Sequence, residues 1–264
     1  MAAEFALRPF FIGFQHMSDM LIKPRREKGE PQLAGPGLLL INPAEAAAAS
    51  RWAQAQQGRE HFLFNSRLFQ LAGRAAEQPF FLAGPAVGAP MAVLTLEKLR
   101  ALGAQRLIVY GWCGSLCPTL RAGDVLLPTW AVSGEGTSGH YPLKKRPESA
   151  RRPRRGLLDL LARQGLTAVE GPIWTTDAPY REGLAQVEAL GGQGVLGVDM
   201  EFAALCTVAA FRQVELAAVL LVSDELRQGG WQPAYKGKAF KAKSRAILQL
   251  LLDYCRLAPP AQRP

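Results

Sequence analysis

Two carboxylates flank a methionine in this chain, where Asp199 and Glu201 stand on either side of Met200. Residues two apart at the end of a strand project to the same side, so the two acids are expected to face one site. A carboxylate accepts two hydrogen bonds from a cis-diol, and a sugar ring offers such hydroxyl groups. The alternative for Asp199 is the N-cap of the apolar helix that follows, which leaves Glu201 unexplained.

Three more polar segments come directly after apolar stretches that are expected to be strands. They are Asn42 after residues 38–41, Gly111–Ser115 after 106–110, and Ser223-Asp224 after 217–222. Because ligands of α/β sheets bind at the carboxyl ends of strands, these segments are expected to converge with Asp199 and Glu201 on one pocket. Asp224 also fits a helix N-cap, since Ser223-Asp224-Glu225 reads as a helix start.

The elements that position these residues follow from the hydrophobic pattern. Strands are expected near 38–41, 61–65, 79–83, 106–110, 124–127, 167–173, 195–198 and 217–222. Helices are expected at 89–102, 154–164, 182–190, 200–211 and 236–255, and after Pro43, which suits the first position of an alanine-rich helix. Apolar strands that alternate with amphipathic helices indicate a mixed sheet covered on both faces.

Five segments in this order resemble the nucleoside phosphorylase family, which includes purine nucleoside phosphorylases, uridine phosphorylases and methylthioadenosine nucleosidases. Asp199-Met200-Glu201 resembles its Glu-Met-Glu signature. The others are Gly111–Ser115 followed by Gly123-Asp124-Val125, the loop Gly134–Tyr141, the base-pocket segment Trp174–Glu182, and Ser223-Asp224. The resemblance covers roughly residues 38 to 255 and implies a three-layer α/β/α sandwich with a twisted mixed sheet.

The resemblance also implies cleavage of an N-ribosidic bond through an oxocarbenium-like sugar. Glu201 would grip the 2′- and 3′-hydroxyl groups and face the developing positive charge, with Asp199 beside it and Met200 packed on the sugar. Asp224, with Ser223, would protonate or hydrogen-bond N7 of a purine. We expect no cofactor and no metal, with phosphate as a possible co-substrate.

The chain departs from the phosphorylases at the residues that would bind the acceptor of the ribosyl group, which is phosphate in those enzymes. Their phosphate-binding arginines fall here on Glu45 and Val109, and a hydroxyl residue of the phosphate turn falls on Trp112. Arg67, which matches an arginine lent across a subunit interface, and Ser115 are the remaining candidates for phosphate. Related hydrolases place a glutamate at the Glu45 position to orient water. Glu45 fits equally well as an exposed acid in a first helical turn, so phosphorolysis and hydrolysis both stay open.

The base pocket is also altered. Tyr180 is kept, but the glutamine and arginine of the uridine enzymes fall on Gly183 and Ala185, so a purine or a modified base is favoured. Trp112 is expected either to line this pocket or to pack in the core. Two histidines complete the candidates, His16 for a neighbouring subunit's ribose and His140 in the uridine-like loop, and a structural role is the alternative for both.

Length and composition fit a single domain. The 264 residues are 48% hydrophobic, and we expect an N-terminal arm at 1–37, one domain at 38–258 and a tail at 259–264. The four cysteines form neither a disulfide framework nor a zinc pattern, no apolar run would span a bilayer, and a cytoplasmic location is expected. We expect a homo-oligomer (dimer, trimer or hexamer), because the Arg67 position and the arm are shared across subunits in the family.

Much of the net charge of +9 is local. Residues 144–155 carry seven basic residues and one acid, which would suit nucleic acid. Without interleaved aromatic residues, a solvated surface loop broken by Pro147 and Pro153 is the favoured interpretation. The functions to compare are therefore a nucleoside-cleaving enzyme, a non-catalytic nucleoside-binding protein on the same fold, and a nucleic-acid-binding protein.

Overall fold

The computed structural model describes residues 20–64, 66–73, 79–142, 146–227 and 230–257. His16, the tail 259–264 and the first part of the arm lie outside these ranges. The first strand begins at Pro36. The division into arm, domain and tail stays a prediction.

One mixed sheet runs through the described part of the chain. Its strands are β1 (Pro36–Leu40), β2 (Arg59–Leu63), β3 (Ser66–Leu71), β4 (Phe80–Gly84), β5 (Arg106–Ser115), β6 (Val125–Gly134), β7 (Ala168–Thr176), β8 (Gly197–Asp199), β9 (Glu215–Arg227) and β10 (Gly230–Pro233). They are ordered β10-β9-β6-β7-β8-β5-β1-β4-β3-β2. β5 also pairs in parallel with β9, so β5, β9, β6, β7 and β8 close into a ring.

Two irregularities let this ring close. The register shifts between Cys113 and Gly114 in β5 and between Pro128 and Ala131 in β6. Bulges of this kind bend a strand and increase its twist. The remaining strands, β1, β4, β3 and β2, extend from β5 as an open wing.

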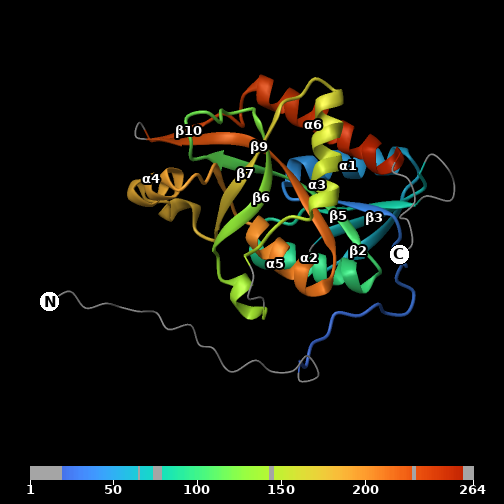
Figure 1. Cartoon of the computed structure of the whole chain (residues 1–264). Helices are drawn as coiled ribbons and strands as arrows, with labels where there is room; N and C mark the ends of the chain where they lie inside the picture. Colours follow the sequence, from blue (N-terminus) through green and yellow to red (C-terminus); the bar gives the residue numbers. More distant parts are fainter. Residues whose placement is uncertain (1–19, 65, 74–78, 143–145, 228–229, 258–264) are drawn as a thin grey trace.

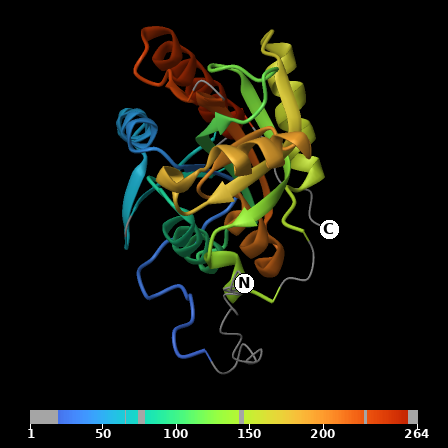
Figure 2. The same cartoon turned by 90° about the vertical axis from the view of Figure 1, so that its left-hand side faces the viewer.

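Helices cover both faces of the sheet. They are α1 (Pro43–Ala55), α2 (Ala89–Ala101), α3 (Arg151–Arg163), α4 (Leu184–Gly192), α5 (Phe202–Arg212) and α6 (Lys238–Leu257), with short 3-10 turns at Thr137–His140 and Pro179–Arg181. α2 and α5 pack on one face and α1, α3 and α6 on the other (Figure 1). The view turned by 90° shows the same layers, with the red α6 above the strands and the teal α2 below them (Figure 2). The predicted α/β/α architecture with a mixed sheet is confirmed.

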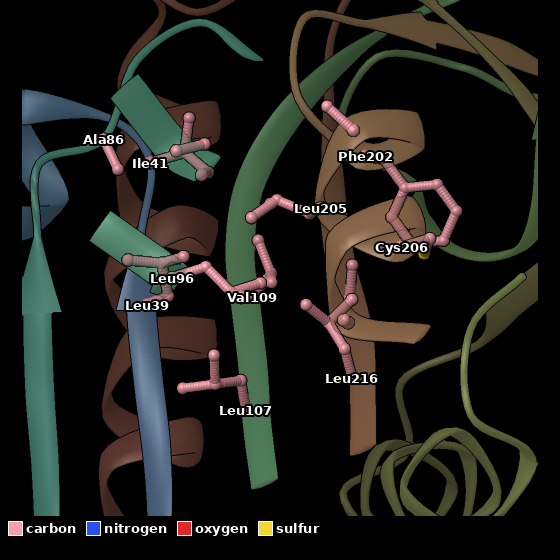
Figure 3. Close-up of a cluster of buried hydrophobic side chains, with 14 of the residues drawn as sticks. Leu39, Ile41, Ala86, Leu96, Leu107, Val109, Phe202, Leu205, Cys206 and Leu216 are labelled. Atoms are coloured by element: carbon pink, nitrogen blue, oxygen red, sulfur yellow. The ribbon is translucent and has the colours of Figure 1, made fainter. Parts of the chain in front are cut away.

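The core on the α2 and α5 face is wholly apolar at its centre. Figure 3 shows Leu39 of β1 and Val109 of β5 packed with Leu96 of α2 and Leu205 of α5. Both strands are buried on both faces, which is why residues 38–41 and 106–110 read as continuous apolar runs. Burial of this surface is the main term that holds the helices on the sheet.

Several predicted boundaries were wrong. β3 and β10 were not predicted, and Gly111–Ser115 is the second half of β5 rather than a turn. Likewise β9 continues through Ser223 and Asp224, so the helix N-cap interpretation of Asp224 is wrong. Pairing with neighbouring strands extends β5 and β9 beyond their apolar cores, a tertiary effect that local pattern does not contain.

The predicted surface loop at residues 144–155 is wrong for its second half. Residues 151–155 begin α3 rather than a loop, and Pro153 lies in the first helical turn, where its missing N–H has no partner to lose. Arg154 is bound there, because its guanidinium donates to Glu170 at 2.8 Å and to Ser149 at 2.6 Å. Lys144 and Lys145 of this run lie outside the described residues.

Among the described helices, none combines the length and the apolar character that crossing a membrane requires.

Candidate active site

Acidic side chains gather around the end of β5. Gly114 pairs with Val198 of β8 on one side and with Asp224 of β9 on the other. Burial raises the pKa of the Cys113 thiol well above its usual range, and the charges of Asp199 and Asp224 raise it further. The two carboxylates therefore both lie close to Cys113. The ends of β8 and of the extended strand β5 therefore lie next to Asp224 of β9, while the convergence of all the motifs on one pocket stays a prediction.

Glu201 is held at the start of α2. It is 5% exposed, and its Oε1 atom accepts a 2.6 Å hydrogen bond from the backbone N–H of Gly88, the residue before the helix. A positive φ of 84° at Gly88 suits glycine and turns this N–H toward the carboxylate. Burial, followed by the charge of Asp199, raises the pKa of Glu201 to about 8. Glu201 therefore holds its proton more tightly than an exposed glutamate does.

Asp199 connects three elements. Its Oδ1 accepts a 2.6 Å bond from the Thr175 hydroxyl of β7, and its Oδ2 accepts the backbone N–H groups of Phe202 (2.7 Å) and Glu201 (3.2 Å). Asp199 therefore caps the start of α5 and orients Glu201. Burial raises its pKa to about 6, against the effect of these bonds. Its predicted contact with substrate stays a prediction.

Thr175 was not singled out from the sequence. Besides donating to Asp199, its hydroxyl accepts the backbone N–H of Ala203 at 2.9 Å. A threonine at the end of a strand is common, so no sequence signal identifies this contact. It depends on the parallel register of β7 and β8, in which Thr175 lies opposite Asp199.

Asp224 lies on β9 with two donors at its carboxylate. The Ser223 hydroxyl lies against Oδ1, and the indole N–H of Trp231 on β10 donates to Oδ2 at 2.8 Å. The Ser223 hydroxyl is also within 3.2 Å of the Cys113 carbonyl oxygen. Trp231 was missed because β10 was not predicted.

Glu45 is buried on the opposite face, which corrects its interpretation as an exposed first-turn acid. It is 8% exposed, and its Oε1 accepts a 2.6 Å bond from the Ser244 hydroxyl of α6. Ser244 also lies 3.0 Å from the Tyr110 hydroxyl of β5. The second carboxylate oxygen, Oε2, is buried and has no hydrogen-bond partner within the described part of the chain.

Two further buried polar atoms have no hydrogen-bond partner among the described residues, Asn42 Oδ1 and Trp112 Nε1. Leu40 of β1 lies opposite Tyr110 of β5, so Asn42 and Trp112 follow two residues later on the same face. The Trp112 ring stacks on Tyr235 at 6.0 Å and meets Phe240 edge-on at 5.1 Å. The Trp112 ring therefore packs against Phe240 of α6, and its role in lining the base pocket stays a prediction.

Val109 does not contribute to the face that carries Glu45. Its side chain points to the opposite face, into the apolar core with Leu96 and Leu205 (Figure 3). Ser115 is also unavailable for phosphate, contrary to prediction. It is 1% exposed, and its hydroxyl lies 2.6 Å from the Leu120 carbonyl oxygen and 2.9 Å from that of Cys117. It holds the loop after β5.

The other predicted residues lie nearer the surface. Tyr180 is fully exposed on the 3-10 turn, His140 is exposed at the end of the other 3-10 turn, and Met200 is partly buried between the two acids. Arg67 is exposed on β3, with one guanidinium nitrogen 3.5 Å from Glu60. A cavity of about 380 Å³ lies apart from the acids, between β2 and α2, and is lined by Glu30, Phe62, Leu63, Phe64, Leu94, Thr95 and Lys98.

Comparison with known proteins identifies the family. The model of the phosphorylase superfamily matches residues 37–255. The chain belongs to the phosphorylase superfamily. The resemblance seen in the motifs is thereby confirmed.

Relatives of this phosphorylase-superfamily member include DeoD-type purine nucleoside phosphorylases of Bacillus thuringiensis and Bacillus mycoides. Each is 30% identical over 159 residues, which cover 55% of this chain and 63% of the relative. The alignment thus spans less than two thirds of the relatives' length.

Two solved structures share the fold. Purine nucleoside phosphorylase from Toxoplasma gondii, in complex with immucillin-H, has a TM-score of 0.74 and 22% identity, and the match covers 85% of this chain and 91% of that one. Uridine phosphorylase from Vibrio fischeri has a TM-score of 0.70 and 19% identity, with 85% and 92% covered.

Replacing Glu201 with Gln is expected to stabilise this phosphorylase-superfamily protein at alkaline pH. The folded-state pKa of about 8 lies above the ordinary value of 4.5, so the folded chain binds this proton more tightly than the unfolded chain. The stabilising effect of the proton is complete below pH 4.5 and is lost as pH rises through 8. Urea unfolding should show Glu201→Gln more stable than wild type by about 1–3 kcal/mol at pH 8.5, with a smaller difference at pH 5. The exposed Glu188→Gln serves as control, and an equal difference at both pH values would contradict the assignment.

Proposed function

We propose that this protein cleaves the N-ribosidic bond of a nucleoside with water as the acceptor. The observation that carries the proposal is the placement of Glu201, a buried carboxylate fixed by Gly88 and raised to a pKa of about 8 by burial and by Asp199. Proteins rarely keep such a costly group unless a ligand uses it. Membership of the phosphorylase superfamily supports the same reaction class.

The proposed chemistry involves separate contacts to the ribose and to the base of a bound nucleoside. Hydroxyl groups of the ribose would donate to Glu201, which favours its ionised form, and the resulting negative charge would face the sugar as it becomes cationic. Asp224 would lie at the base, opposite Gly114 on β9. Purine is the favoured base, in agreement with the purine nucleoside phosphorylases among the relatives.

Three buried polar atoms that have no hydrogen-bond partner among the described residues bear on which molecule attacks the sugar. Asn42 Oδ1 and Glu45 Oε2 need donors, while Trp112 Nε1 needs an acceptor. A water molecule offers both. A phosphate dianion offers no donor, and like charges about 4 Å apart repel by roughly 4 kcal/mol per pair of unit charges at an effective dielectric of 20. We therefore place water at Glu45, which would take the proton of the attacking water.

Cleavage is expected to persist in phosphate-free buffer. With a panel of purine, pyrimidine and modified nucleosides, the sugar product should be free ribose whether phosphate is present or absent. Glu45→Gln keeps the shape but cannot take a proton, and should lower kcat by about 10²-fold with a smaller change in KM. Strict dependence on phosphate, with ribose 1-phosphate as product, would sink the hydrolytic assignment.

Glu201→Gln is expected to lower turnover by about 10²-fold or more, because Gln keeps the size of the side chain but loses the charge that faces the cationic sugar. Steady-state kinetics on a substrate found in the panel measures this. Wild-type turnover in the variant would remove Glu201 from the mechanism. Tight nucleoside binding without any cleavage by wild type would instead favour the non-catalytic alternative.

We also infer that the protein is a homo-oligomer that associates through the open wing of the sheet. Phe62 and Phe64 at the edge strand are each 82% exposed, and Leu94 on α2 is 42% exposed beside them. Arg67 lies on the same wing. Large apolar side chains gathered in this way are typical of protein contacts.

Sedimentation at micromolar protein concentration should therefore show an assembly larger than the monomer. The double variant Phe62→Ser, Phe64→Ser should shift it toward the monomer, while its folded-state circular dichroism stays unchanged, since both side chains are exposed. A wild-type monomer under these conditions would be the contrary result.

A further inference from the structure

The hydrogen-bond chain that ends at Glu45 has a fixed direction. The Ser244 hydroxyl of α6 donates its one hydrogen to Glu45 Oε1 at 2.6 Å. The Tyr110 hydroxyl of β5 lies 3.0 Å from the Ser244 Oγ atom and 3.1 Å from the Ser244 carbonyl oxygen. Because the Ser244 hydrogen is already used, Tyr110 is the donor in both contacts. Hydrogen bonds are therefore donated from Tyr110 to Ser244 and from Ser244 to Glu45.

The three side chains of this chain are shielded from solvent. Tyr110 is fully buried, Ser244 is 2% exposed and Glu45 is 8% exposed. A buried hydroxyl group without a partner would be costly, and here both hydroxyl groups have one. The residues come from β5, α6 and the first turn of α1, so packing of three elements sets the orientation of the Glu45 carboxylate.

The two carboxylate oxygens of Glu45 are in different environments. Oε1 accepts the Ser244 hydrogen, whereas Oε2 has no hydrogen-bond partner within the described residues. The donated hydrogen draws negative charge at Oε1, and the lone pairs of Oε2 are engaged by no donor of the described chain. Oε2 is therefore the oxygen of Glu45 that is available to accept a proton.

Helix α6 brings a second open polar atom to the same region. Phe240 and Ser244 are one helical turn apart, so they lie on one face of α6. Phe240 meets the Trp112 ring edge-on at 5.1 Å, and Ser244 binds Glu45. Trp112 and Glu45 thus contact successive turns of α6, and Trp112 Nε1 is buried without a partner among the described residues. An N–H donor and a carboxylate acceptor match the lone pairs and the hydrogens of one water molecule.

We propose that Ser244 and Tyr110 are positioning residues for the attack of water, and that they orient Glu45 so that its Oε2 atom takes the proton of the attacking water. The inference rests on the proposed function and assigns part of its acceptor site to α6. Ser244 acts directly on Glu45, whereas Tyr110 acts through Ser244. The effects of removing the two hydroxyl groups should therefore be graded.

The reaction balances with water as the only other reactant. The water oxygen bonds to C1′ as the bond between C1′ and the base nitrogen breaks, and the electron pair of that bond leaves with the base. One proton of the water moves to Glu45 Oε2, and the other remains in the new hydroxyl group at C1′. Glu45 then releases its proton to solvent, and the base gains one proton from solvent.

The test is steady-state kinetics in phosphate-free buffer with the substrate found in the nucleoside panel, starting from adenosine and inosine. Ser244→Ala removes the donor to Glu45 Oε1, while the Tyr110 hydroxyl keeps the main-chain carbonyl oxygen of residue 244 as its acceptor. The variant should lower kcat by roughly 10-fold or more with a smaller change in KM, because a displaced base slows the chemical step without removing a contact to the nucleoside. Tyr110→Phe should lower kcat less.

Ser50→Ala is the matched control. Ser50 lies on α1, the helix that also carries Glu45, and its hydroxyl donates to the Ala46 carbonyl oxygen at 2.8 Å. The same substitution therefore removes a hydroxyl group and a hydrogen bond from this helix without removing a partner of Glu45. Its kcat should equal that of the wild type.

Combination with Glu45→Gln separates positioning from a structural role. If Ser244 acts through Glu45, adding Ser244→Ala to Glu45→Gln should lower kcat by less than about twofold further. An equal loss in both backgrounds, or wild-type kcat in Ser244→Ala, would overturn this proposal alone. If circular dichroism shows that Ser244→Ala does not fold, Tyr110→Phe takes its place in the same comparison, with the same two contrary results. Absence of cleavage by wild type, or strict dependence on phosphate, would instead overturn the proposed function and this step with it.

Discussion

The Asp199 carboxylate joins β7, β8 and α5 at the end of the sheet where the motifs meet. It receives the Thr175 hydroxyl and two backbone N–H groups at the start of α5. Hydrophobic packing has no direction, so it would hold α5 against the sheet without fixing the turn that leads into it. Hydrogen bonds to a buried carboxylate provide this direction. The position of Glu201 two residues later depends on them.

A buried acid of this kind has a cost that shapes the rest of the site. Asp199 and Glu201 both have raised pKa values because burial disfavours their charged forms, and the charge of Asp199 raises the pKa of Glu201 further. Asp199 offsets part of this cost through its hydrogen bonds to Thr175, Glu201 and Phe202, whereas Glu201 accepts one backbone N–H, that of Gly88. Buried carboxylates that lower the stability of the folded chain are typical of binding and catalytic sites.

The sheet separates the polar groups into two sets. Glu201 lies with α2 and α5, whereas Glu45, Tyr110 and Ser244 lie between β5 and the helices α1 and α6. The two sets meet where β1 and β4 end, since Ile41 accepts the backbone N–H of Ala86, two residues before Gly88. A nucleoside bound across this edge would have its sugar near Glu201 and its attacked face toward Glu45 in the proposed reaction. The closed ring of strands that carries Asp224 forms the third side.

The sequence by itself determined the alternation of strands and helices, the layered fold and the family, because these depend on apolar periodicity and on motifs of a few neighbouring residues. It also indicated that Glu201 follows directly after a strand, as it does after β8. The lengths of β5 and β9 could not be predicted from the sequence. The second halves of both strands are extended because neighbouring strands pair with them.

The tertiary structure alone decided what each acid touches. Glu45 is buried because α6 brings Ser244 against it. These two residues are 199 positions apart in the chain. Trp231 reaches Asp224 because of the register of β10 on β9. Hydrogen bonds and desolvation depend on atoms within a few ångströms, and which atoms these are is settled only when distant segments pack.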